Sequence, residues 1–152
     1  TTTTVVTVTT APVTTTEAPS NTARPGSPET GDVEGFRLAE VVIEGESLTV
    51  AVADNRGRRS RGLTDVEDLG DLAGMLFLWG EPPASVFTME DTLIALDIAF
   101  LDRDGVVVEV LEMEPCEATP CPKYGITPVY WAALESPLGS LGLEAGDEVG
   151  LP

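Results

Sequence analysis

The sequence contains no histidine among its 152 residues. Histidine is the commonest general base in enzymes and the commonest side-chain ligand of transition metals. Its absence excludes a Ser-His-Asp triad and the usual histidine-ligated zinc enzymes. Hard cations bound by carboxylates remain compatible with the composition. We nevertheless expect no metal site and no cofactor.

Basic residues are also scarce: 8 Lys and Arg stand against 26 Asp and Glu, which gives a formal net charge of −18. Nucleic-acid phosphates and anionic membrane surfaces attract basic proteins, so neither is an expected partner. No apolar run approaches the roughly 18 residues that span a bilayer. The chain begins with Thr instead of Met, which either a cleaved export signal or a trimmed chain explains.

Residues 1–35 are rich in Thr and Pro and contain no aromatic residue. Segments of this composition bury too little apolar surface to offset the entropy lost on ordering. We therefore predict a disordered stalk or linker, with a weak strand over residues 1–8 as the alternative. A stalk implies an anchor before residue 1, either a lipidated cysteine or a membrane segment. The protein is then expected to be extracytoplasmic and to meet the membrane only through that anchor.

Residues 36–152 are predicted to form one β-rich domain, which we expect to be a monomer. Helical signals are short and confined to residues 55–62, 64–72 and 137–143. The pattern predicts a mainly β fold, an antiparallel β-barrel or sandwich with one or two short helical turns. The predicted strands, separated by Gly and Pro turn signals, cover residues 36–43, 47–53, 74–79, 85–89, 96–101, 106–113, 129–135 and 147–151.

Two short polar or cysteine-containing loops have competing interpretations. The segment 102–105, Asp-Arg-Asp-Gly, resembles the start of a calcium loop but lacks its later ligands, so a hairpin turn is the better prediction. Cys116 and Cys121 lie in a Pro-rich loop and favour a local disulfide over a metal or redox pair. Two thiols without histidine are too few for zinc, and the redox spacing is C-x-x-C. The disulfide is expected to restrain the loop that carries Lys123 and Tyr124.

Several ordered blocks resemble the small prokaryotic proteins grouped as domain of unknown function 192. The resemblance implies a compact β-rich fold, commonly on exported proteins, and no established activity. That family usually has Lys-Asn where this chain has Glu90-Asp91, and Met where it has Thr64, so a preference for anionic ligands would be lost or inverted here. The blocks are Arg61-Gly62-Leu63, Gly74-Met75-Leu76-Phe77, Met89-x-x-Thr92, Leu96-Asp97-Ile98-x-Phe100-Leu101-Asp102, Pro115-Cys116 and Pro120-Cys121-Pro122 with Tyr124, and Gly146-Asp147.

The candidate ligand-binding site is centred on Asp97, an acid inside an apolar run. A carboxylate in such a place needs donors, because burying it unpaired costs several kcal/mol. In a structural role, Asp97 would pair with Arg61 or accept hydrogen bonds from the backbone amides of the turn 90–92. In a functional role, it would line a polar pocket together with Asp91. The complete predicted site is Arg61, Met89, Asp91, Thr92 and Asp97, with Tyr124 over one edge; no catalytic residue is assigned.

Four of the eight basic residues fall between Asn55 and Gly62. On so acidic a chain this cluster is a candidate for capturing an anion. The alternative is a short exposed helix or loop whose arginines pair with surrounding acids. Both interpretations remain open from the sequence.

Three functions are compatible with these residues. A module that binds a small molecule or an envelope glycan would use Tyr124, Trp79 or Trp131 as an apolar platform and the acids for hydroxyls. A hydrolase would need a pair of catalytic carboxylates, for which Asp91 and Asp97 are the candidates. In retaining glycosidases the two catalytic carboxyl groups lie about 5 Å apart. A structural or partner-binding domain would have no cleft. We expect binding without catalysis.

Overall fold

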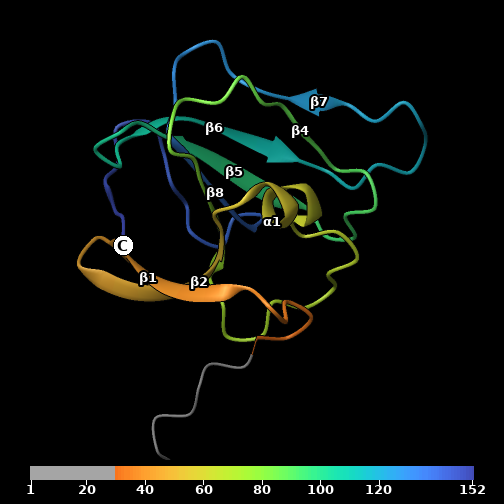
Figure 1. Ribbon diagram of the computed structural model, residues 1–152, viewed down its shortest axis with the longest axis horizontal. Helices are drawn as coiled ribbons and strands as arrows, with labels where there is room; N and C mark the ends of the chain where they lie inside the picture. Colours follow the sequence, from red (N-terminus) through yellow and green to blue (C-terminus); the bar gives the residue numbers. More distant parts are fainter. Residues whose placement is uncertain (1–29) are drawn as a thin grey trace, which may run out of the picture.

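The computed structural model describes residues 30–152; the weak strand and nearly all of the stalk predicted above lie outside the described residues. One seven-stranded sheet forms the body of the domain (Figure 1), in the order β6-β5-β8-β3-β2-β1-β9. Its strands are β1 (Arg37–Ile43), β2 (Glu46–Ala53), β3 (Gly74–Leu78), β5 (Leu96–Leu101), β6 (Val107–Met113), β8 (Ala132–Pro137) and β9 (Val149–Gly150). The other elements of the described part are helix α1 (Arg56–Arg61) and a ribbon of β4 (Phe87–Thr88) with β7 (Lys123–Tyr124).

The sheet curls until its edge strands meet at one end. Val106 forms an isolated antiparallel bridge with Glu148. The Val107 amide donates to the Asp147 carbonyl, and the Val149 amide donates to the Gly105 carbonyl, both at 2.8 Å. These bonds join the start of β6 to the start of β9, the two edge strands of the sheet. The predicted mainly β, barrel-like fold is therefore confirmed.

One strand pair departs from the antiparallel pattern, because β2 and β3 run parallel. A parallel neighbour requires a crossover connection, and residues 54–73 supply it. This crossover contains α1 and carries Leu63, Leu69 and Leu72 into the core. The segment 64–72, predicted as a helical turn or irregular loop, forms turns without a helix, as does 137–143.

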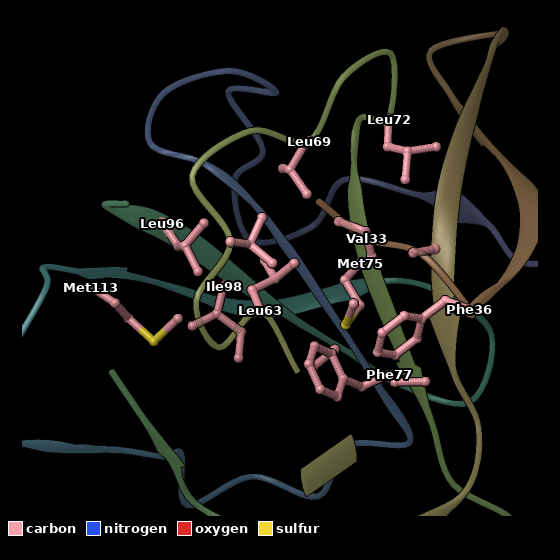
Figure 2. Close-up of a cluster of buried hydrophobic side chains, with 14 of the residues drawn as sticks. Val33, Phe36, Leu63, Leu69, Leu72, Met75, Phe77, Leu96, Ile98 and Met113 are labelled. Atoms are coloured by element: carbon pink, nitrogen blue, oxygen red, sulfur yellow. The ribbon is translucent and has the colours of Figure 1, made fainter. Parts of the chain in front are cut away.

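Both faces of the central strands are buried, which explains their nearly continuous apolar runs. The inner face of the curled sheet carries Leu76, Ala99 and Leu134. The outer face carries Met75 and Ile98, and Figure 2 shows them packed with the three crossover leucines. The crossover therefore closes over the outer face as a second layer.

Residues 30–35 pack against the domain, although the sequence assigned them to the stalk. Val33 is 1% exposed within the outer-face core. The Asp32 carboxylate accepts the amides of Glu67 and Asp68, each at 3.1 Å. The boundary predicted at residue 36 therefore lies inside the packed structure. Composition missed this because one buried Val among Gly, Asp and Glu creates no periodic pattern.

Both predicted hairpins form. The β1–β2 turn has positive φ at Glu44 (51°) and Gly45 (82°), as a two-residue type I′ turn requires. The Asp102 carboxylate accepts the amides of Asp104 and Val106 at 2.9 and 3.0 Å, which closes the β5–β6 turn. This bonding confirms the hairpin interpretation of the segment 102–105.

The strand predicted at 129–135 is displaced, because β8 begins at Ala132. Tyr130 instead turns into an aromatic cluster, and its hydroxyl donates to the Ser85 carbonyl at 2.8 Å. Cys116 and Cys121 form the predicted disulfide, with their Cα atoms 5.6 Å apart. No helix within residues 30–152 is long and apolar enough to cross a membrane.

Candidate functional site

A cleft of about 800 Å³ lies over the outer face of the sheet. Helix α1 and residues 62–64 contribute one part of its lining, and residues 81–92 contribute another. Phe77 and Glu135, from neighbouring strands β3 and β8, form its floor, with Trp79 just beyond the end of β3. The volume is in the range of pockets that hold small molecules.

The segments around the cleft are tied to one another. The Asp65 amide donates to the Asp91 carbonyl at 2.8 Å, which joins the crossover to the turn 89–92. The β4–β7 ribbon pairs Phe87 with Tyr124, so the disulfide-closed loop holds the segment 81–92 from another direction. Below lies a cluster of aromatic rings whose neighbouring centroids are 4.9 to 6.3 Å apart: Phe77, Trp79, Phe87, Phe100 and Tyr130.

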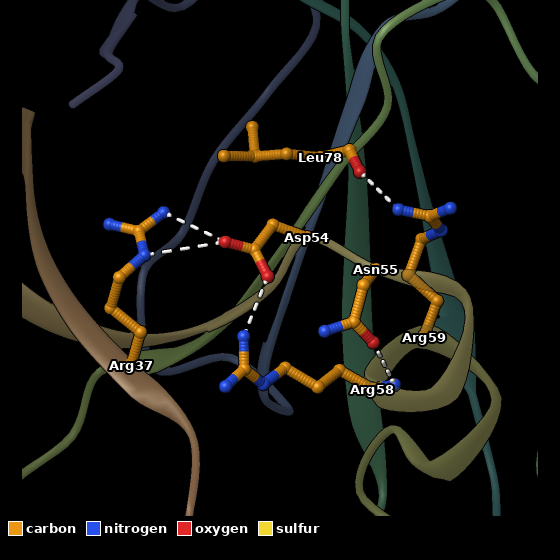
Figure 3. Close-up of polar contacts among 6 residues, drawn as sticks. All are labelled: Arg37, Asp54, Asn55, Arg58, Arg59 and Leu78. Carbon is orange, nitrogen blue, oxygen red and sulfur yellow. Dashed lines mark hydrogen bonds and ion pairs between the residues drawn. The ribbon is translucent and has the colours of Figure 1, made fainter.

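Helix α1 begins with an N-cap, since the Asn55 side chain accepts the Arg58 amide at 2.9 Å. Its successive arginines diverge, as Figure 3 shows: the Arg58 guanidinium donates to Asp54 at 2.9 Å, whereas Arg59 points elsewhere. The Arg58 hydrogen bond, supported by two from Arg37, lowers the pKa of the Asp54 carboxyl. The ion-pairing interpretation of the arginine cluster is therefore correct for Arg58.

The other three arginines of α1 line the cleft and have different surroundings. Within residues 30–152, no ion pair involves Arg56, Arg59 or Arg61. Arg59 donates to the Leu78 carbonyl at 2.8 Å, and its guanidinium lies 5.5 Å from the Trp79 ring centroid. A guanidinium has five N–H donors, so this one is held in place with donors to spare. Among residues 30–152 these three guanidinium groups therefore form no ion pair, although Glu81, Glu90 and Asp91 line the same cleft.

Glu135, which the sequence did not single out, lies on the floor of the cleft. Its partners across the ladder are Met75 on β3 and Ile98 on β5, and it is only 6% exposed. No hydrogen bond or ion pair joins its carboxyl group to any other described residue. Burial raises the pKa of Glu135 to about 8, so the group is mostly protonated at neutral pH. The available sequence signal was the same as for Asp97: one acid in an apolar strand.

Three of the six residues predicted to bind ligand line the cleft, namely Arg61, Asp91 and Thr92. Met89 is instead packed into the outer-face core, 1% exposed. Tyr124 belongs to the β4–β7 ribbon and packs partly buried against the same core. Neither of these two side chains lines the cleft.

Asp97 lies on the opposite face of the sheet. Leu96 and Ile98 belong to the outer-face core, so strand alternation directs Asp97 to the other side. Its carboxylate accepts the Gly139 amide at 2.7 Å, which caps the turn after β8. The sequence predicted that Asp97 would pair with Arg61 or accept the amides of residues 90–92, and both predictions are wrong. The carboxylate pair considered for a hydrolase, Asp91 with Asp97, is divided between the two faces.

Asp91 has a backbone conformation that restricts which residues can replace it. Its φ is +53°, and the Thr92 amide donates to the Met89 carbonyl at 3.1 Å across the turn. Asn, Asp and Gly adopt this left-handed conformation more readily than other residues. The exchange of the usual family Asn for Asp91 therefore preserves the turn and changes its charge.

We expect Asp91→Asn to leave the free energy of unfolding within about 0.5 kcal/mol of wild type. Asp91→Val should lower it by about 1 to 2 kcal/mol, because a β-branched residue is strained at this positive φ. Urea denaturation of both variants measures the difference. Equal losses in the two variants would contradict the turn interpretation.

The fold and the cleft define a small, curled β domain with an arginine-lined site of ligand size. The profile of the DUF192 family, described as "Uncharacterized ACR, COG1430", matches residues 39–151. The chain belongs to this family, as the ordered sequence blocks predicted.

Two solved structures share the fold. A protein of unknown function from Novosphingobium aromaticivorans DSM 12444 has a TM-score of 0.67 and 27% identity, with 85% of this chain and 96% of that chain covered. A putative transcription regulator from Sinorhizobium meliloti 1021 has a TM-score of 0.64 and 24% identity, with 75% and 93% covered. No curated protein matches the chain. These comparisons establish family and fold, and the ligand must be inferred from the cleft.

Proposed function

We propose that this protein binds a small hydroxylated anion, such as an acidic sugar or a glycan unit that carries one, in the arginine-lined cleft. The observation that supports the proposal is the state of the arginines. Arg56, Arg59 and Arg61 line a cleft of about 800 Å³ and have no ion-pair partner among residues 30–152, on a chain with 26 acidic residues. The Arg61 guanidinium also donates to the Glu34 carbonyl at 3.1 Å and lies over the Phe36 ring. The neighbouring Arg58, which does not line the cleft, is paired with Asp54 instead.

The remainder of the lining suits hydroxyl groups. Glu81, Glu90 and Asp91 line the same cleft and accept hydrogen bonds, and Trp79 offers apolar surface. A sugar acid supplies both complements: its carboxylate meets a guanidinium in charge-assisted hydrogen bonds, and its hydroxyls meet the protein's carboxylates. The ligand class expected from the sequence, a small molecule or glycan, is kept, and an anionic group is added to it. This differs from the sequence-based expectation that Glu90 and Asp91 remove or invert a preference for anionic ligands.

We also infer an oxidising, extracytoplasmic location for the domain. The support is the disulfide between Cys116 and Cys121, since structural disulfides persist mainly in exported proteins. A ligand of the envelope or the surroundings fits that location.

The function is tested by thermal shift and calorimetry with D-galacturonate, D-glucuronate, D-galactose and propionate. We expect saturable stabilisation by the two sugar acids, because a ligand of the folded state raises the midpoint by mass action. Arg59→Gln should weaken sugar-acid binding by about 10- to 100-fold, the range for hydrogen bonds to charged groups. Arg58→Gln is the matched control, because Arg58 is the adjacent arginine on α1 and lies outside the cleft lining.

Three results would contradict the proposal. Equal stabilisation by D-galactose and D-galacturonate would remove the anion requirement. Equal loss of affinity in the Arg59→Gln and Arg58→Gln variants would remove the cleft as the site. No stabilisation by any probe would leave a structural or partner-binding domain.

A further inference from the structure

We infer that Glu135 is a further ligand-binding residue of this cleft, and that it donates a hydrogen bond, as a neutral carboxylic acid, to an uncharged oxygen of the ligand. The inference rests on the proposed function of the cleft and narrows the ligand class. Besides its anionic group, the ligand would carry a carbonyl, ether or hydroxyl oxygen that reaches the cleft floor.

The backbone around Glu135 is held on both sides. Strand β8 lies between β3 and β5, and Glu135 pairs with Met75 on one and Ile98 on the other. Residue 74 is glycine, and a Cβ there would collide with the Glu135 carbonyl oxygen. The absent side chain lets β3 approach β8 closely at this position. Such a strand position presents its side chain to the cleft in a restricted set of orientations.

Among residues 30–152, no side chain or backbone group bonds the carboxyl group of Glu135, although a buried acid normally has a partner. A buried polar group without a hydrogen bond destabilises the folded state, because it has lost its bonds to water. Yet no fully buried side-chain nitrogen or oxygen in residues 30–152 lacks a hydrogen bond. The Glu135 oxygens, which no described group bonds, therefore keep a small exposed area, and the residue lines the cleft. A ligand atom in the cleft would complete their hydrogen bonding.

The surroundings favour the neutral form of this carboxyl group. Strands β3 and β5 present Met75, Phe77, Ile98 and Phe100 on the same face, none of them titratable. Burial is what raises the pKa of Glu135 to about 8. The acid is consequently a donor at neutral pH, whereas its carboxylate form would only accept and would repel an anion. The charged side chains that line the cleft are Arg56, Arg59 and Arg61 from α1, and Glu81, Glu90 and Asp91 from residues 81–92.

The test measures D-galacturonate binding by calorimetry from pH 6 to pH 9 for the wild type, Glu135→Gln and Glu135→Leu. At pH 6 we expect Glu135→Leu to bind at least tenfold more weakly, and Glu135→Gln, whose amide keeps a donor, to stay within about threefold of wild type. Wild-type affinity should fall about tenfold by pH 9, because the donor is lost as Glu135 ionises. The affinity of the Glu135→Gln variant should not fall between pH 6 and pH 9. The affinity of Asp97→Asn, a substitution on the opposite face of the sheet, should fall as it does in wild type. Urea denaturation confirms that each variant is folded.

The outcomes separate this inference from the proposed function. Wild-type affinity in Glu135→Leu at pH 6 would overturn the role of Glu135 and leave the arginine site standing. The same pH profile in wild type and Glu135→Gln would also overturn it. A wild-type protein that binds neither D-galacturonate nor D-glucuronate at any pH would overturn both.

Discussion

Glu135→Gln is expected to stabilise the protein increasingly over wild type as the pH rises from about 4.5 to 8. The folded-state pKa of Glu135 is raised to about 8, against an ordinary value of 4.5. Within this window the folded state holds a proton that the unfolded state has released, so stability falls as the pH rises. Below pH 4.5 the folded state has the full stability that protonated Glu135 allows, and above pH 8 all of that stability has been lost. The difference between the folded and unfolded pKa values corresponds to roughly 5 kcal/mol of unfolding free energy. The Gln variant keeps its stability over this pH range because Gln does not ionise.

Urea denaturation of both proteins at pH 5, 6.5 and 8.5 measures this effect. The free energy of unfolding of the variant minus that of wild type should increase by several kcal/mol over the series. Glu109→Gln, which removes an exposed acid from β6, controls for the change in net charge. Parallel pH curves for wild type and Glu135→Gln would show that the carboxyl group is solvated and not buried.

Gly74→Ala is expected to lower the free energy of unfolding by about 3 kcal/mol. The added Cβ would collide with the Glu135 carbonyl oxygen and would come within 3.3 Å of the Ser136 Cα. Both are backbone atoms of β8, which is paired with a strand on each side, so the neighbours cannot shift without breaking the ladder. The strain therefore falls on the two strands that form the cleft floor.

Gly80→Ala is the matched control for this substitution. Apart from Gly80 and its two chain neighbours, no heavy atom of residues 30–152 lies within 4 Å of the Cβ that Ala would add at Gly80. Its stability should change by no more than about 0.5 kcal/mol. Urea denaturation of the two variants gives the comparison, and similar midpoints would show that β3 and β8 separate easily.

Local patterns in the sequence were sufficient for the class of fold and for its turns. Gly45 and the segment 102–105 predicted hairpins because turn chemistry acts over two to four residues. Cys116 and Cys121 predicted their disulfide because so few residues separate them. Composition placed the domain start at residue 36, but Val33 is buried in the same core cluster as Leu63 and Leu69, about 30 residues or more away in the sequence, which no local pattern reveals.

Asp97 and Glu135 present nearly the same local signal, an acid within an apolar strand, yet they have opposite environments. Alternation relates neighbours along one strand, but it does not say which face of the sheet a cleft covers. The register of β5 against β8 pairs Glu135 with Ile98 and Asp97 with Ser136. Only that pairing, with the crossover on the outer face, places Glu135 under the cleft and Asp97 away from it.

The sequence by itself determined the family, the β class, the net charge, the hairpins and the disulfide, because each depends on composition or on residues close together in the chain. The tertiary structure decided which arginine of α1 pairs with a carboxylate and which ones line the cleft without an ion pair to any residue in 30–152. It also decided that Glu135, and not Asp97, is the buried acid that lines the cleft. Burial and proximity of this kind arise when segments far apart in the sequence pack together, and that packing is set by the sheet order and the crossover.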